Sequence, residues 1–252
     1  MKIIITKIIF ILIIFINYSN AQENITVEYL NENNTDFPVN LKTILNCNTN
    51  NSVFTTFFGK RKKTKTSNEE DNSAIISAET IDTYQVIDLK EKTLFSIENI
   101  DESIYKINEE LPHLLWQTES NETKRIERFS CNKAKVTFRG RKWIAWYSTE
   151  IPYSFGPWKF NGLPGLILEI YDDTNRYHWT ANKIKFNTKG DILLDIKDNK
   201  FITNVSLKEF VEKQEKLVLE REKRIYSMLP RGSEKVNEKS VRKGIEVNYE
   251  WE

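Results

Sequence analysis

The sequence has few residues of the types that carry most enzyme chemistry. It contains two histidines and two cysteines in 252 residues, and neither histidine stands in a metal-ligand spacing such as HExxH. GxSxG nucleophile motifs, glycine-rich phosphate loops, P-loop lysines and dinucleotide fingerprints are all missing from it. We therefore expect no cofactor, no bound metal and no histidine-based catalytic centre. His178, between two aromatic residues in RYHWT, is interpreted as a partly buried strand residue.

Neither sign of charge is in excess. The chain has 37 Lys and Arg residues against 36 Asp and Glu residues. Two of the lysines lie in the first 21 residues, so the chain from residue 22 onward is close to neutral. A balanced chain has no general attraction for nucleic acid or anionic lipid. We expect no nucleic-acid partner.

Only the N-terminus carries a long hydrophobic run. Residues 1–21 combine two early lysines, an apolar run over Ile8–Ile16 and a small, polar end at Ser19–Ala21, which is typical of a signal peptide. The run is shorter than the roughly 20 residues of a membrane span, although a retained anchor helix is the alternative. We expect one domain over residues 22–252, periplasmic or secreted or associated with the outer membrane, without stable membrane insertion once 1–21 is removed.

The two cysteines leave two possibilities open. Cys47 and Cys131 are 84 residues apart in the sequence. Export would permit a disulfide between them, whereas two buried free thiols are the alternative. Sequence separation does not say whether the two residues meet.

Short runs of alternating apolar and polar residues predict a mostly β protein. The expected fold is a single antiparallel curved sheet or partial barrel with one long C-terminal-region helix packed on it. Three consecutive strands over 166–171, 176–186 and 192–198 are expected to form an antiparallel meander. Charged loops are expected over 60–73 and 231–243. The other predicted strands are 25–30, 41–47, 52–58, 84–89, 93–100, 104–108, 113–118, 124–129, 134–139, 142–148 and 244–251.

One helix is predicted over 206–229. Ser206 and Glu209 have the spacing of a capping box, apolar residues recur at helical intervals, and Pro230 with Gly232 ends the segment. The apolar stripe either covers one face of the sheet or remains exposed as a partner-binding surface.

Glycine and proline, scarce elsewhere, cluster in FNGLPGLILEI at 160–170. Leu163-Pro164-Gly165-Leu166 predicts a type II turn, in which proline sets φ at the second position and Gly165 takes the positive φ of the third. Gly162 is expected to relieve crowding or to let another backbone approach closely.

The segment GPWKFNGLPGLILEI resembles the signature of the GLPGLI family, named for the hexapeptide Gly162–Ile167, and CNKAKVTFRGRKWIAWYSTEIPYSFGPWKF at 131–160 continues the pattern. The resemblance implies an exported Bacteroidetes protein with a β-rich fold, often encoded near outer-membrane TonB-dependent transport genes. It implies no catalytic residue, because the family has no established activity. The carried-over positions are structural: Gly140, Arg141, Trp146, Pro152, Gly156, Pro157, Phe160, Gly162, Leu163, Pro164, Gly165, Leu166 and Ile167.

Aromatic residues concentrate between 116 and 179, with arginines among them. Such rings and guanidinium groups bind sugars, peptides or acyl chains in grooves, and the alternative is that they fill the core. The candidate ligand-binding residues are Arg141, Trp143, Trp146, Tyr147, Trp158 and Trp179.

These observations favour an exported, non-enzymatic binding protein for a hydrophobic or peptide-like ligand or for an outer-membrane transport partner. One alternative is an envelope hydrolase that uses carboxylates near the hexapeptide. A third is a structural or adaptor protein that acts through the 206–229 helix. The carboxylates nominated for the hydrolase are Glu150, Glu169, Asp172 and Asp173.

Overall fold

The computed structural model describes residues 24–59, 81–101, 103–188, 192, 202–228 and 242–252. The predicted signal peptide and the 60–73 loop lie outside the described residues. So do all of the predicted 192–198 strand except residue 192 and nearly all of the 231–243 loop.

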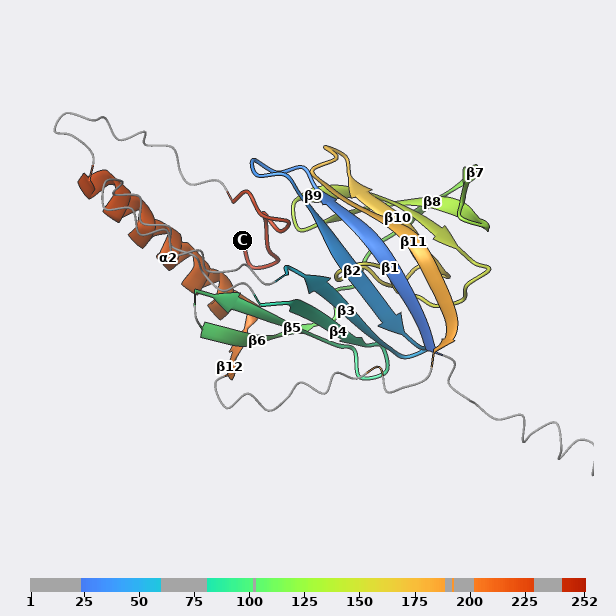
Figure 1. Cartoon of the computed structure of the whole chain (residues 1–252), viewed down its shortest axis with the longest axis horizontal. Helices are drawn as coiled ribbons and strands as arrows, with labels where there is room; N and C mark the ends of the chain where they lie inside the picture. The colour runs from blue at the N-terminus through green and yellow to red at the C-terminus, as the bar shows by residue number, and fades with distance from the viewer. Residues whose placement is uncertain (1–23, 60–80, 102, 189–191, 193–201, 229–241) are drawn as a thin grey trace, which may run out of the picture.

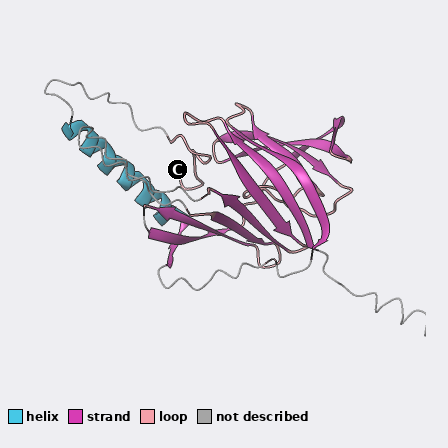
Figure 2. Ribbon diagram, viewed as in Figure 1, coloured by secondary structure: helices cyan, strands magenta, loops and turns pink. Residues whose placement is uncertain are grey.

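The described strands form one sheet that is not closed (Figures 1 and 2). Its order is β12-β6-β5-β4-β3-β2-β1-β11-β10-β9-β8-β7. The strands are β1 (Asn24–Asn33), β2 (Val39–Cys47), β3 (Asn51–Phe57), β4 (Thr83–Asp88), β5 (Thr93–Ile100), β6 (Ser103–Glu110), β7 (Gln117–Ile126), β8 (Phe129–Phe138), β9 (Arg141–Ser148), β10 (Leu166–Asp172), β11 (Tyr177–Thr188) and β12 (Ile202–Ser206).

Two antiparallel meanders, β1–β6 and β7–β11, make up most of the sheet and join where β1 pairs with β11. Every pairing is antiparallel except that of β12 with β6, which is parallel. The prediction of a mostly β, open, largely antiparallel sheet with one C-terminal-region helix is confirmed. The short polar turns that separate alternating runs explain this, because they permit hairpins and few crossovers.

Three predicted strands are wrong in position or kind. The predicted 113–118 strand is displaced, because residues 111–116 form no strand and β7 begins only at Gln117; Pro112, just before the predicted strand, has no N–H to give to a ladder. The predicted 124–129 strand spans the turn between β7 and β8, where Glu127 has φ 53°. Residues 244–251 form no strand either, and contact the β8–β9 turn through Val247 N–H, which donates to Arg139 O at 3.0 Å.

The helix α2 (Leu207–Met228) begins where the capping box predicts. Ser206 N–H donates to Glu209 Oε2 at 2.7 Å, and Glu209 N–H donates to Ser206 Oγ at 3.3 Å. Its first turns bury Leu207, Phe210 and Val211 against β6 and β12, and the rest extends away from the sheet (Figure 1). The exposed apolar residues of that part are Val218, Leu219, Ile225 and Met228.

The main core is dominated by aromatic rings. Trp143 is fully buried and lies 4.8 Å, ring centroid to centroid, from Phe160.

Cys47 and Cys131 are buried in this core as free thiols, so the structure takes the free-thiol alternative. None of the described helices is both long and apolar enough to cross a membrane.

The two glycines of the hexapeptide exchange the roles that the sequence suggests. Gly162 has φ +89°, and a Cβ there would meet only Trp116 Nε1, at an ordinary contact distance of 3.9 Å. Gly165 does not have a positive φ, and a Cβ there would lie 2.2 Å from Ser148 O. The type II turn is therefore wrong, because proximity to the end of β9, rather than φ, requires glycine at 165.

Candidate functional site

The segment just before the hexapeptide holds a strained aromatic residue. Trp158 has φ 55°, a conformation that costs a bulky side chain on the order of 1–3 kcal/mol and is found at functional sites. Its ring packs 5.7 Å from Phe138 and 5.3 Å from Phe160. This conformation places the next side chain, Lys159, in the interior, where it is 2% exposed.

Lys159 belongs to a buried ion cluster drawn from distant parts of the chain. Its Nζ lies 2.6 Å from Glu109 Oε1 on β6 and 3.1 Å from Glu246 Oε1 near the C-terminus. Arg139 Nη2 lies 2.8 Å from Glu109 Oε2, and Arg139 also pairs with Glu246 and Glu250. The two cations and the two buried carboxylates, Glu109 and Glu246, balance one another.

The β8–β9 turn explains why Arg139 enters this cluster. Arg139 and Gly140 have φ 46° and 82°, as the two central residues of a type I′ hairpin do, and glycine accepts this conformation most easily. Phe138 pairs with Arg141 on either side of the turn. From this turn the Arg139 side chain reaches Glu109 on β6 and Glu246 and Glu250 in residues 242–252, which we call the C-terminal segment.

A cavity of about 160 Å³, which we call the inner cavity, adjoins the ion cluster. β5, β6, the first turns of α2, the 158–159 segment and the C-terminal segment all contribute to its wall. The lining residues are Ser96, Glu98, Ile107, Trp158, Lys159, Leu207, Phe210, Val211, Gln214, Gly244, Ile245, Glu246 and Tyr249.

Two polar side chains of β5 face the inner cavity. Ser96 is 1% exposed, and its Oγ has no hydrogen-bond partner in the described structure. Glu98 lies two residues further along the same strand, hence on the same face, and Lys159, whose charge acts on it, forms its ion pairs with Glu109 and Glu246 instead. An unpartnered buried polar group costs free energy, so Ser96 Oγ, with the half-buried Glu98 beside it, marks a place where a ligand or water would bind.

The carboxyl groups of the site differ in proton affinity. Burial, reinforced by the nearby charges of Glu246 and Glu109, raises the pKa of Glu98 to about 7, although Lys159 opposes the rise. Burial also disfavours the charge of Glu246, but Lys159 and Arg139 together hold its pKa below its ordinary value. Glu98 therefore exchanges its proton near neutral pH while Glu246 stays ionised.

The C-terminal segment forms one wall of the inner cavity and is held there by β9. Arg141 Nη2 donates to Gly244 O at 2.7 Å, and Arg141 Nε donates to Ile245 O at 3.1 Å. Arg141, a predicted ligand-binding residue, thus contacts the backbone that lines the cavity. Its Nη1 also pairs with Asp172 Oδ2 at 3.0 Å.

The predicted aromatic residues all belong to the main core. Trp143, Tyr147, Trp158 and Trp179 are at most 7% exposed. Trp146 is also buried but interacts with Lys124, whose Nζ lies 4.6 Å from a Trp146 ring centroid. Of these rings, only that of Trp158 reaches the inner cavity.

The carboxylates nominated around the hexapeptide are dispersed among separate structural contacts. Glu150 accepts a hydrogen bond from Ser130 N–H at 2.8 Å, and Asp172 is fully buried with Arg141. Glu169 Oε1 lies 2.9 Å from His178 Nε2, and burial lowers the pKa of His178. Sequence reasoning missed Glu98, Glu109 and Glu246, although Ser96 and Glu98 alternate with apolar positions on the predicted β5 strand.

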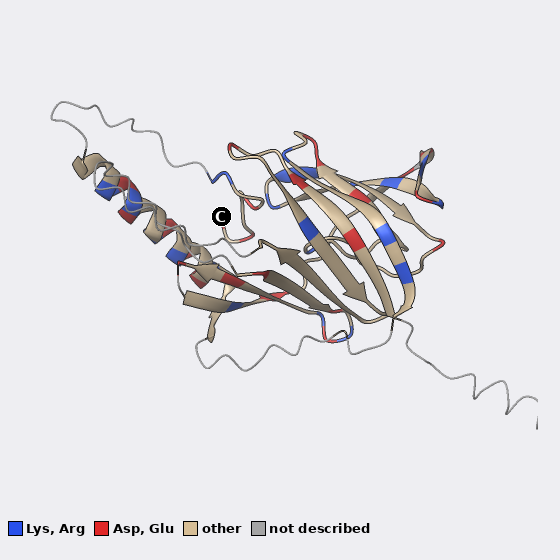
Figure 3. Cartoon of the chain, in the orientation of Figure 1, with Lys and Arg blue, Asp and Glu red and all other residues tan. Residues whose placement is uncertain are grey.

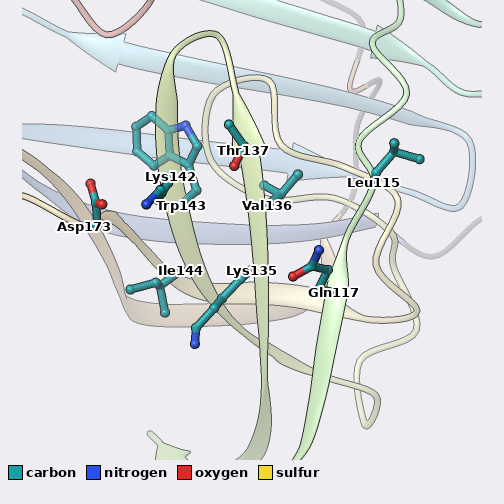
Figure 4. A pocket seen from close by; sticks show the side chains of 9 residues that line it. All are labelled: Leu115, Gln117, Lys135, Val136, Thr137, Lys142, Trp143, Ile144 and Asp173. Atoms are coloured by element: carbon teal, nitrogen blue, oxygen red, sulfur yellow. The ribbon is translucent and has the colours of Figure 1, made fainter.

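A second hollow, which we call the outer hollow, has a volume of about 550 Å³ (Figure 4). Cross-strand register brings Gln117, Lys135 and Ile144 into one row across β7, β8 and β9. Leu115 at its rim is 74% exposed. The remaining lining residues are Val136, Thr137, Lys142, Trp143 and Asp173.

Charged residues of both signs are spread over the strands and α2 (Figure 3). Within the described residues, no three His, Cys, Asp or Glu side chains are grouped as a metal site.

A family model described as "Protein of unknown function (Porph_ging)" matches residues 138–169. This short match includes Arg139, Trp158 and Lys159 of the site, together with the hexapeptide. No curated protein matches the chain.

Two solved structures share the fold. "Structure of PNGF-II in C2 space group" is 16% identical, covers 75% of this chain and 32% of that chain, and has a TM-score of 0.54. "Structure of PNGF-II in P21 space group" has the same identity and coverage and a TM-score of 0.52. The chain therefore spans about a third of the length of these structures, and the similarity establishes the fold alone.

Proposed function

We propose that the chain is an exported cell-envelope protein that binds a peptide-like ligand or an outer-membrane transport partner in the inner cavity. One observation supports this proposal. The unpartnered hydroxyl group of Ser96 and the carboxyl group of Glu98 line a cavity beside the strained Trp158. The resemblance of residues 131–170 to the GLPGLI family supports the envelope setting and the association with transport.

The lining of the inner cavity favours a peptide-like ligand over a purely hydrophobic one. A hydrophobic molecule would leave Ser96 Oγ and the Glu98 carboxyl group without hydrogen bonds, which costs binding free energy. A peptide offers donors and acceptors along with apolar groups that pack on Phe210 and Val211. The small volume suits one inserted side chain or chain end, because whole drug-sized ligands occupy about 300–1,000 Å³.

A cavity-filling comparison tests the site. A library of short peptides is screened by ligand-observed NMR against the wild type, Ser96→Met and Thr137→Met. Ser96→Met fills the inner cavity, whereas Thr137→Met places the same side chain in the outer hollow. We expect binding to be lost in Ser96→Met and kept in Thr137→Met. The reverse pattern would move the site to the outer hollow, and an absence of binding to the wild type would refute the proposal.

A hydrolase is the second candidate function, and Glu98 is the observation that favours it. A carboxyl group with a pKa of about 7 beside two other carboxylates has the properties of a general acid or base. Incubation with peptidoglycan fragments and peptides, followed by mass spectrometry of products, separates the candidates. Turnover that disappears in Glu98→Gln supports catalysis, and binding without turnover supports a binding protein.

A further inference from the structure

The charge balance around the inner cavity distinguishes Glu98 from the other acids. Lys159 and Arg139 are both engaged by Glu109 and Glu246. Glu98 adds a further carboxylate on the wall of the same cavity, and Lys159, whose charge acts on it, forms its own ion pairs with Glu109 and Glu246. Lys159 gives the ionised form of Glu98 only partial stabilisation, because the pKa of Glu98 still lies at about 7, and a cation in the ligand would supply a counter-charge of its own.

We propose that the inner cavity selects a cationic group, the side-chain ammonium or guanidinium of a basic residue in the ligand, which pairs with the Glu98 carboxylate and donates to Ser96 Oγ. This inference rests on the proposed binding function and names the chemistry of its ligand. An ammonium group has three donors and no acceptor. It can therefore donate to both acceptors on this face of β5, Ser96 Oγ and the Glu98 carboxylate.

The size and walls of the cavity fit such a group. A volume of about 160 Å³ corresponds to roughly five water molecules at about 30 Å³ each, which suits a charged head group on an alkyl stem. Ile107, Phe210 and Val211 supply apolar surface for the stem, as long basic side chains require when they are partly buried.

The same arrangement makes selection depend on pH. The charged groups near Glu98 are Glu109 from β6, Lys159 from the 158–159 segment and Glu246 from the C-terminal segment, whereas α2 contributes the uncharged Gln214. Tyr249 stays neutral near pH 7, since burial raises its pKa. Glu98 gains its charge as the pH rises through about 7, and a bound cation favours that charged form.

The test compares three peptides that differ only in the central residue: Ac-Gly-Lys-Gly-NH₂, Ac-Gly-Arg-Gly-NH₂ and Ac-Gly-norleucine-Gly-NH₂. Norleucine keeps an alkyl chain of similar length and lacks the charge. Affinities are measured by NMR titration at about pH 6 and about pH 8, the two sides of the Glu98 transition. At the higher pH we expect a basic peptide to bind at least about tenfold more tightly than the norleucine peptide, and less preference at the lower pH.

Two variants assign the effect. Glu98→Gln keeps the side-chain shape and should abolish both the preference and its pH dependence. Glu91→Gln makes the same change at an exposed turn of the β4–β5 hairpin and should alter neither. Circular dichroism verifies that both variants are folded.

Equal binding of the norleucine and basic peptides would overturn the cation proposal while leaving the binding function intact. So would a preference that persists in Glu98→Gln. If none of these peptides binds, the cation proposal fails, and the library screen decides separately whether the binding function fails with it.

Discussion

Lys159 Nζ lies 2.6 Å from Glu109 Oε1, and the two side chains are only 2% and 5% exposed. The pair joins β6, in the β1–β6 meander, to the 158–159 segment, which lies in the connection between β9 and β10 of the other meander. Arg139 also pairs with Glu109, and Glu246 also pairs with Lys159. The Lys159–Glu109 pair is therefore the centre of a network rather than an isolated contact.

Removing one member of this network should be costly. We expect Lys159→Met to lower the free energy of unfolding by about 3–5 kcal/mol, because it leaves buried carboxylates short of a counter-charge. Urea denaturation measures the change. Lys159→Met combined with Glu109→Gln should recover part of the loss, and a double variant as unstable as the sum of the singles would contradict the coupling.

The hexapeptide glycines should respond differently to alanine. At Gly165 a Cβ would lie 2.2 Å from Ser148 O, so we expect Gly165→Ala to cost about 2–3 kcal/mol, as overpacking against a backbone does. Gly162 has φ +89° and space around it, so Gly162→Ala should cost only about 1–2 kcal/mol through strain. Thermal unfolding of the two variants gives the comparison, and a larger loss at 162 would contradict the structure.

Stability should fall with rising pH because of Glu98. Its pKa is about 7 in the folded protein against 4.5 as the ordinary value. Between these values the folded state holds a proton that the unfolded state has released, so stability decreases as the pH rises from about 4.5 to 7. The loss is of order 3 kcal/mol at 1.36 kcal/mol per pKa unit.

Glu98→Gln isolates that contribution. The variant should be more stable than the wild type above about pH 7 and should show a flatter stability profile between about pH 5 and 7. Chemical denaturation at several pH values provides the measurement. An unchanged profile in the variant would show that the Glu98 carboxyl group is not shifted.

The two cysteines should behave as inaccessible free thiols. Cys47 and Cys131 are both fully buried, and burial raises the pKa of Cys131 to about 11, which keeps the reactive thiolate scarce. We expect no reaction with Ellman's reagent in the native protein and two thiols per chain after unfolding without reductant. Finding none after unfolding would reveal a disulfide instead.

The sequence predicts the strands well where alternation and turn chemistry agree. NTNN between two β-rich runs correctly predicts the β2–β3 hairpin, and Ser206 with Glu209 correctly predicts the start of α2. Segment 244–251 alternates as a strand would but is held by Arg141 and the β8–β9 turn. Such tertiary contacts override local pattern.

The candidate site was harder to predict because its members are dispersed in the sequence. Glu98, Lys159 and Glu246 come from three segments that only the folded sheet brings together. The aromatic residues were easier to notice, yet most of them fill the core. Trp158 is the exception, because it belongs to the core and also lines the inner cavity. Its positive φ is a property of the backbone that composition does not reveal.

The position of β1 has a consequence for how the protein acquires its structure. Asn24 pairs with Thr188 and Asn33 with Tyr177, so the earliest strand completes its hydrogen bonding only with one of the last. Contacts of such long range close slowly, because the intervening chain must first be ordered. The junction between the two meanders can therefore form only after the chain has been made as far as β11, at residues 177–188.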